Sequence, residues 1–240
     1  MKFFILGDSW GVGEYCLVNK QYESIPDTGL DYYLKQHGHS VTNISAGSAG
    51  NFGQLRNAYW TLKNNSNYDY IIWFHTESMR DIQEIIINDP EESAIQFPKF
   101  NFQNFNSGLD YIDNQNYKYA QAIADEYQIP FIVIGGHSPV NPIINNFSFA
   151  KYTIFSWLAE LLELTIVPPK NTFNSWEKIV KILEHYKLDQ KKFIIDHLEE
   201  LEKLKKIQDL AIQSPLFPDN THPSTQCYNE LANRIIKIIS

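Results

Sequence analysis

At 240 residues, with 43% hydrophobic side chains, the chain is long enough for one well-packed α/β domain and short for two, so we expect a single domain spanning 1–240. A formal net charge of −8 without a basic stripe disfavours nucleic acid as a partner. The two cysteines, Cys16 and Cys227, exclude a disulfide framework and a cysteine-based zinc site, and we expect both to be reduced thiols.

The apolar runs bear on where the protein is located. The run before Gly7 is too short for the hydrophobic region of a signal peptide. No run approaches the ~18 residues of a membrane span. We therefore expect a soluble protein, cytoplasmic as synthesised, with no membrane partner. Packaging in a virion, or export in an assembly by a route without a signal, stays open.

In chain order, five short apolar runs alternate with helical patterns, which is the rhythm of a parallel sheet. The predicted strands are residues 2–6, 41–45, 69–74, 129–134 and 164–167. Helical spacing predicts helices over 29–36, 51–62, 78–87, 109–127 and 149–162. Pro223 is predicted to lie in the first turn of a closing helix, whose core anchors are Cys227, Leu231, Ile235 and Ile239.

Two segments depart from this rhythm and are predicted to be insertions. Residues 89–108 are rich in Phe, Asn and Pro without a clear period, which is typical of a lid over an active-site rim or of a loop above a satellite core. Residues 172–211 form a charged, amphipathic helical insertion. It serves either as a docking surface for a protein partner or as a solvated face over the domain.

Residues that can carry chemistry lie near the two ends of the chain. Gly7-Asp8-Ser9 follows the first predicted strand, and open α/β sheets bind ligands at the carboxyl ends of strands. A serine hydroxyl is a nucleophile only if a base reaches it, and His222 is the candidate base. Asp219, three residues earlier, would fix the imidazole tautomer. The structural alternative is a capping serine and a polar turn before a helix.

The pairing of Gly-Asp-Ser after an N-terminal strand with Asp-x-x-His ahead of a C-terminal helix resembles the SGNH (GDSL-type) hydrolase family. The resemblance implies a three-layer sandwich with a five-stranded parallel sheet in the flavodoxin-like order 2-1-3-4-5 and helices on both faces. It also implies a serine esterase that needs no metal or organic cofactor. Residues 43–51 resemble the family's second block, whose glycine supplies an oxyanion donor. We assign that role to Gly47, which is nearer the strand end, with Gly50 as the alternative.

The third block departs from the family pattern. Where the family shows Gly-x-Asn-Asp after a strand, residues 75–81 read His-Thr-Glu-Ser-Met-Arg-Asp, so that Glu77 replaces the Asn that helps to bind the oxyanion. An ionised carboxylate would repel a developing negative charge. Glu77 is therefore either protonated, or directed elsewhere, or the cause of a weakened oxyanion hole.

The expected function is hydrolysis of a small acyl ester, such as an O-acetyl group on a carbohydrate or a similar ester. An aromatic content of 14% suits a rim that stacks on sugars, although aromatic side chains also fill cores. The alternative is a non-catalytic or weakly active SGNH-like module that binds carbohydrate or serves structure in a phage or surface assembly. A nucleotide-binding flavodoxin-like protein is disfavoured, because the turn after the first strand has too few small residues and hydroxyls to hold a phosphate.

Overall fold

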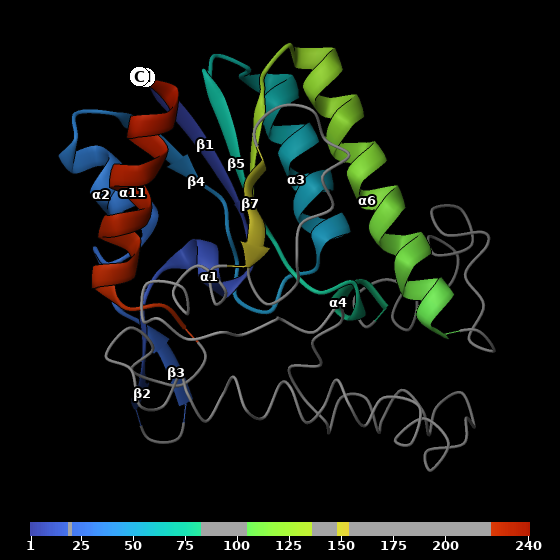
Figure 1. The fold of residues 1–240 in the computed structure, drawn as a ribbon, viewed down its shortest axis with the longest axis horizontal. Coiled ribbons are helices and arrows are strands. Elements are labelled where there is room, and N and C mark those ends of the chain that lie inside the picture. Colours follow the sequence, from blue (N-terminus) through green and yellow to red (C-terminus); the bar gives the residue numbers. More distant parts are fainter. Residues whose placement is uncertain (19–20, 83–104, 136–147, 154–221) are drawn as a thin grey trace.

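The computed structural model describes residues 1–18, 21–82, 105–135, 148–153 and 222–240 (Figure 1). Within these residues a five-stranded sheet lies at the centre, in the order β4-β1-β5-β6-β7. Its strands are β1 (Lys2–Gly7), β4 (Ser40–Asn43), β5 (Tyr70–His75), β6 (Phe131–Gly135) and β7 (Ser148–Thr153). Each neighbouring pair is parallel, so the predicted α/β class with a parallel sheet is confirmed.

The three central strands owe their positions to uninterrupted apolar sequence. β1 contains Phe-Phe-Ile-Leu, β5 Ile-Ile-Trp-Phe and β6 Phe-Ile-Val-Ile, and all of these side chains are buried. A parallel strand covered on both faces needs apolar side chains at successive positions. Because these side chains alternate between faces, Phe3 and Ile5 belong to one hydrophobic core and Phe4 and Leu6 to the other.

Helices cover both faces of the sheet (Figure 1). α2 (Leu30–Gln36) and α11 (Thr225–Ile239) contribute to the core that contains Phe3. α3 (Asn51–Asn64) and α6 (Phe105–Tyr127) contribute to the opposite core. The carboxyl ends of the strands are left for the loops that follow them, and these loops carry the polar residues singled out in the sequence.

The closing helix begins slightly later than predicted. Ser224 is the N-cap of α11, so Pro223 precedes the helix instead of lying in its first turn. Cys227, Leu231 and Ile235 recur every four residues and are buried, which confirms the predicted core face of this helix.

The last strand of the sheet is not the one predicted. This place is taken by β7, whereas the sequence predicted a helix over 149–162. β7 pairs with β6 through Val133–Ser148 and Gly135–Thr153, with an irregularity between these pairs. Pairing with a neighbouring strand thus outweighs the local helical spacing. The predicted strand 164–167 lies outside the described residues.

Of the two predicted insertions, only the end of the first, residues 105–108, lies within the described residues. The irregular insertion predicted over 89–108 extends too far, because α6 already begins at Phe105 and its first turn lies within that range. Residues 89–104 and the helical insertion 172–211 lie outside the described residues. Within the helix predicted over 78–87, the structure describes α4 (Met79–Asp81).

Three short elements near the N-terminus were not predicted. α1 (Ser9–Val12) follows β1, and β2 (Tyr15–Val18) pairs antiparallel with β3 (Gln21–Ser24) in a separate two-stranded sheet. Figure 1 shows α1 and this hairpin beyond the carboxyl ends of the central strands. Strands of four residues without an Asn-Gly or Asp-Gly turn between them give little sequence signal.

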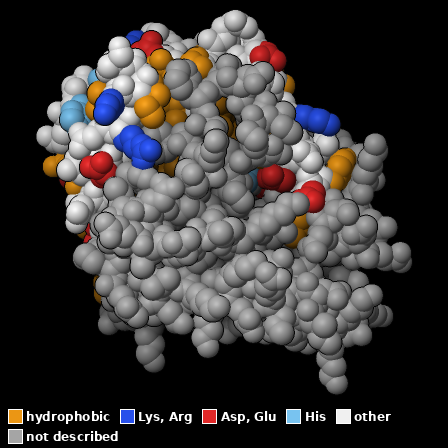
Figure 2. Space-filling model, in the orientation of Figure 1, with side chains coloured by type: hydrophobic (Ala, Val, Ile, Leu, Met, Phe, Trp, Pro, Cys, Tyr) orange, Lys and Arg blue, Asp and Glu red, His pale blue; other side chains and the backbone are white. Residues whose placement is uncertain are grey.

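Three further observations on the described residues concern membrane-spanning helices, the cysteines and the charge on the surface. In this part of the chain no helix is both long and apolar enough to cross a membrane. Cys16 and Cys227 are free thiols, as predicted, and Cys227 is buried. On the face drawn in Figure 2, charged side chains of both signs are interspersed over the described surface.

Candidate active site

Ser9 lies at the carboxyl end of the central strand β1. The strand ends at Gly7, whose φ of +150° and close approach to Phe74 require glycine, since an added Cβ would lie 2.5 Å from the Phe74 Cβ. Asp8 then caps α1, its Oδ1 accepting from the Trp10 N–H at 2.9 Å. Ser9 is the first helical residue and is only 8% exposed. The turn therefore holds the Ser9 hydroxyl in one place.

A second loop, after β4, packs tightly against this turn. The Asn43 side chain donates to the Gly11 carbonyl at 2.8 Å and accepts from the Ser45 N–H at 3.0 Å. A Cβ on Gly11 would approach the Ser45 Cβ to 2.7 Å, so only glycine allows this contact. The loop that carries Gly47 is thereby fixed beside the Ser9 turn.

His222 comes from the opposite end of the chain and meets Ser9. Its Nε2 lies 3.0 Å from the Ser9 Oγ, across 213 positions of sequence. This is the distance at which an imidazole can take the proton of a serine hydroxyl. Ser9 and His222, the two residues expected to work together, are therefore in contact. Asp219 lies outside the described residues.

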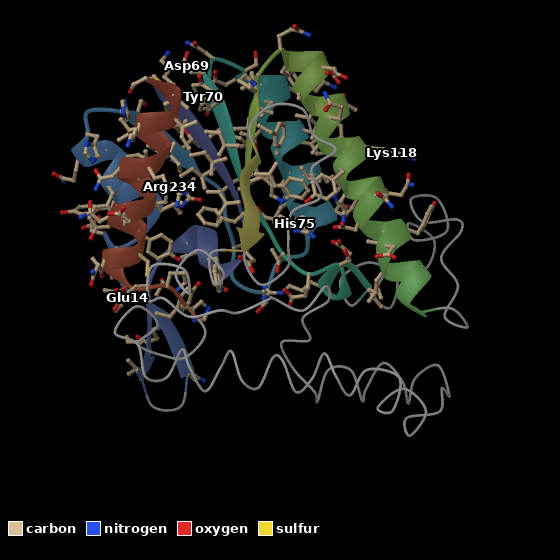
Figure 3. The ribbon with its side chains drawn as sticks, viewed as in Figure 1. Glu14, Asp69, Tyr70, His75, Lys118 and Arg234 are labelled. Atoms are coloured by element: carbon tan, nitrogen blue, oxygen red, sulfur yellow. The ribbon has the colours of Figure 1, made fainter. Side chains whose placement is uncertain are left out.

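Helix α11 is attached to the segment that follows Ser9. The Glu14 carboxylate accepts from the Thr225 N–H at 2.6 Å and from the Thr225 hydroxyl, so that it caps the helix from outside. Figure 3 shows Glu14 at the N-terminal end of α11. The Tyr228 hydroxyl lies 2.7 Å from the Trp10 carbonyl and 3.2 Å from the Gly13 carbonyl. These contacts hold His222, just ahead of the helix, against the Ser9 turn.

The Tyr15 ring covers the imidazole. The two rings are stacked, with centroids 4.4 Å apart and an interplanar angle of 28°. Tyr15 follows Glu14 directly and begins strand β2. Sequence reasoning missed this residue because the hairpin that carries it was not predicted.

Glu77 occupies a charged arrangement beneath the Ser9 turn. Arg80 pairs with Glu77 through Nε at 2.9 Å and with Asp8 through Nη1 at 3.1 Å. The other Glu77 oxygen accepts from the Thr76 hydroxyl at 2.7 Å. Burial opposes the charge of Arg80, but attraction to Glu77 and Asp8 outweighs it and leaves the pKa of the guanidinium above its ordinary value.

The contacts of Glu77 show where its carboxylate is directed. Its carboxylate is directed at Arg80 and Thr76, and each oxygen accepts a hydrogen bond. A carboxylate so engaged offers no donor to a substrate oxygen. Arg80 was missed in the sequence, although its position three residues after Glu77 is the spacing of a local ion pair.

The loop with Glu77 and Arg80 is itself fixed by α3. The buried Asn51 side chain donates to the Thr76 carbonyl at 2.7 Å and accepts from the Thr76 N–H at 2.9 Å. Asp81 accepts from the Phe52 N–H at 2.8 Å, at the start of the same helix, and from Asn116 at 2.7 Å. The residues before and after the Glu77–Arg80 pair are therefore both anchored.

The two candidate oxyanion glycines differ in their surroundings. Gly50 is buried as the N-cap of α3, whereas Gly47 is exposed and lies beside Tyr15. A Cβ on Gly47 would lie 3.4 Å from the Tyr15 hydroxyl oxygen. Within the described part of the chain, the N–H groups of Ser9 and Gly47 donate to no protein acceptor. No group of three potential metal ligands occurs among the residues described.

A second polar pair lies on the other side of β5. His75 is buried at the end of the strand, and its Nε2 lies 2.7 Å from the Asp113 Oδ1 on α6 (Figure 3). The imidazole also stacks on Tyr117, with centroids 5.2 Å apart. Because it belongs to the α3 and α6 side of the sheet, this pair fixes the strand end and is separate from the Ser9–His222 contact.

Comparisons with known proteins give structural matches only. No family model matches the sequence, and no curated protein does. The chain is similar to the psychrotrophic esterase EstA from Pseudoalteromonas sp., with a TM-score of 0.41, 12% identity, and coverage of 99% of this chain and 96% of that one. It is also similar to a carbohydrate acetylesterase family member from Sinorhizobium meliloti, with a TM-score of 0.46, 10% identity, and coverage of 100% and 97%.

A third match is to the acetyl xylan esterase AlAXEase, with a TM-score of 0.40, 12% identity, and coverage of 100% of both chains. By their descriptions all three proteins are esterases. Identities of 10 to 12% and TM-scores below 0.5 assign no activity to this chain. The chemistry must be taken from the arrangement of its own residues.

Proposed function

We propose that this chain is a serine ester hydrolase in which Ser9 is the nucleophile and His222 the general base. The observation that carries the proposal is the distance of 3.0 Å between the Ser9 Oγ and the His222 Nε2. A hydroxyl at the end of a central parallel strand, in contact with an imidazole, is the arrangement needed to activate serine. Asp219 is proposed to accept from the other imidazole nitrogen and to complete a Ser-His-Asp triad.

The reaction runs in two halves. In the first, the Ser9 Oγ attacks the ester carbonyl while His222 takes the hydroxyl proton, and the tetrahedral intermediate collapses as the imidazolium returns that proton to the leaving alcohol. In the second, His222 takes a proton from water, whose oxygen attacks the acyl-serine and releases the acid. Ser9 then regains its proton, so that no metal or organic cofactor is consumed.

The negative oxygen of the intermediate needs donors that are already in place. We propose the N–H groups of Ser9 and Gly47, which have no protein acceptor among the described residues. Glu77 contributes indirectly, since Arg80 balances its charge and ties its loop to Asp8, next to the nucleophile. Its negative charge is thereby compensated near the site.

The substrate class that we propose is a small acyl ester, such as an O-acetyl group, on a carbohydrate or similar alcohol. The Tyr15 ring stands against His222 and beside Gly47, which restricts the room for a long acyl chain on that side. An aromatic side chain at the edge of the site also suits a sugar ring, which packs on aromatic faces.

The test is hydrolysis of p-nitrophenyl acetate by the wild type and by Ser9→Ala. We expect the variant to lose the activity while keeping its circular dichroism spectrum, because Ser9 contributes little to the core. Ser66→Ala, at an exposed serine, is the matched control and should retain full activity. A fluorophosphonate probe should label Ser9 alone, as peptide mapping would show. Equal hydrolysis by the wild type and Ser9→Ala would refute the nucleophile.

The alternative is a non-catalytic module that binds carbohydrate or serves structure in a larger assembly. The observation that favours it is Glu77, a carboxylate where a donor is expected. The two functions differ in the labelling experiment, because only an activated serine reacts with the fluorophosphonate. A wild-type protein that stays unlabelled and inert towards acetyl esters would favour the module.

A further inference from the structure

Tyr15 is held next to the site by the contacts of Glu14, the residue before it. Glu14 accepts from Thr225 at the start of α11. The Glu14 N–H donates to the Thr28 hydroxyl at 3.0 Å, and its carbonyl accepts from the Ile25 N–H at 2.8 Å. The ring of Tyr15 is therefore placed by the fold and not only by its own rotamer.

The phenol reaches from the catalytic base to the oxyanion glycine. Its ring is stacked on the His222 imidazole at 4.4 Å. Its hydroxyl oxygen lies 3.4 Å from the position that a Cβ on Gly47 would take. The phenol thus contacts the imidazole that lies against Ser9 and also lies close to the Gly47 backbone.

The Tyr15 hydroxyl is a donor without an acceptor among the described residues. A hydroxyl that is partly buried usually has a hydrogen-bond partner, because leaving it unpaired costs free energy. Burial, and then the nearby charge of Asp8, raises the pKa of Tyr15 above its ordinary value, so the phenol keeps its proton in neutral and mildly alkaline solution. It can therefore donate when a negative oxygen forms beside it.

Glu77 and Arg80, which lie near the Ser9 turn, are engaged with each other, and Arg80 also with Asp8. Both Glu77 oxygens accept hydrogen bonds, and neither can donate. Arg80 directs Nε at Glu77 and Nη1 at Asp8. Tyr15 contacts His222 and lies beside Gly47, and it carries an unused donor in the described part of the chain.

We propose that the Tyr15 hydroxyl donates a third hydrogen bond to the oxyanion, together with the N–H groups of Ser9 and Gly47. This inference rests on the proposed function of Ser9 as nucleophile. A donor that forms its bond as the carbonyl becomes tetrahedral stabilises the transition state more than the bound ester. It also explains how the site functions with a carboxylate at position 77.

The experiment compares wild type, Tyr15→Phe and Tyr68→Phe with p-nitrophenyl acetate as substrate. Tyr15→Phe keeps the ring on His222 and removes only the hydroxyl. We expect kcat and kcat/KM to fall together, by about 10- to 100-fold, with KM within about twofold of wild type. Tyr68 precedes strand β5, and its hydroxyl donates to the Thr42 hydroxyl on β4. Tyr68→Phe removes this hydroxyl away from the candidate site and should leave kcat unchanged.

Two further measurements separate donation from structure. The rate at which a fluorophosphonate labels Ser9 should fall in Tyr15→Phe, because the phosphonyl oxygen occupies the same place, while the melting temperature should not change. Wild-type kcat in a folded Tyr15→Phe would overturn the role of the hydroxyl and leave Ser9 as nucleophile. If the wild type and Ser9→Ala are both inert towards the ester and the probe, the proposed function fails and the role of Tyr15 fails with it.

Discussion

Arg80 joins two carboxylates that belong to different strands of the sheet. Asp8 follows β1 and Glu77 follows β5, and the guanidinium lies within 3.1 Å of both with 11% of its side chain exposed. A buried charge is tolerated only when it is paired and hydrogen-bonded. Its removal would leave two buried negative charges without their partner next to Ser9, so we expect this residue to stabilise the fold around the candidate site.

We predict that Arg80→Met lowers the free energy of unfolding by about 3 to 5 kcal/mol, since it leaves buried carboxylates without their partner. Urea denaturation measures the change. Lys35→Met is the control, because its ion pair with Asp31 is on the surface and should be worth about 0.5 kcal/mol or less. The double variant Arg80→Met, Glu77→Gln should recover part of the loss. An Arg80→Met protein as stable as wild type would show that the ion pairs contribute nothing.

At the scale of elements, α11 is the helix that positions His222, which lies just ahead of it. Its hydrophobic face packs in the core with α2, and its N-terminus is capped by Glu14 from the segment that follows α1. The same segment continues into the hairpin that carries Tyr15. One short stretch between α1 and β2 therefore positions both His222 and the Tyr15 ring that is stacked on it.

We predict that Glu14→Ala reduces kcat by about 10-fold and the free energy of unfolding by about 1 to 2 kcal/mol, because it removes the cap that sets the start of α11. Ester hydrolysis and urea denaturation give the two values. Glu23→Ala, at an exposed position on the partner strand of the hairpin, is the matched control and should alter neither. Full activity in Glu14→Ala would mean that His222 is positioned by other contacts.

At the scale of the whole molecule, the candidate site is assembled from segments that are far apart in sequence. Ser9 follows the first strand, Gly47 follows β4, and His222 precedes the closing helix. Strand β1 contributes side chains to both hydrophobic cores, whereas α11 contributes to the core that contains Phe3. We therefore expect cooperative unfolding to destroy the cores and the site in one transition.

We predict that Leu231→Ala, in the buried face of α11, lowers the free energy of unfolding by about 2 to 5 kcal/mol. The urea midpoint should shift equally for fluorescence of the buried Trp10 and Trp73 and for residual esterase activity. Ile238→Ala, on the exposed part of the same helix, should change the free energy of unfolding by about 0.5 kcal/mol or less with either probe. Loss of activity well before loss of fluorescence in the wild type would show that α11 detaches independently.

The parts of the fold that could be predicted are those that a short stretch of sequence determines. β1, β5 and β6 are continuous apolar runs, and such runs have few alternatives to a central parallel strand. β7 was assigned to a helix because its place depends on pairing with β6, which local spacing does not report. The β2–β3 hairpin was missed because each strand has four residues and no turn signal separates them.

The residues of the candidate site also fall into two groups: those that a short motif indicates, and those whose contacts only the fold creates. Ser9 and His222 could be predicted because each lies in a short motif next to a recognisable element, and the structure brings their side chains into contact. Arg80 and Tyr15 could not be predicted, because their roles depend on which distant groups they touch. Glu77 could be singled out in the sequence, and Arg80 has the spacing of a local ion pair with it, but the contact of Arg80 with Asp8 could be found only in three dimensions.

The contact between residue 9 and residue 222 also has a consequence for biosynthesis. A ribosome adds His222 to the chain 213 positions after Ser9, and α11 must then leave the exit tunnel before its apolar face can cover the sheet. Until then, Ser9 in the nascent chain lacks its contact with His222, and the apolar face of the sheet that α11 covers is exposed. A chain truncated before α11 would keep this apolar surface exposed and would lack the contact between Ser9 and His222.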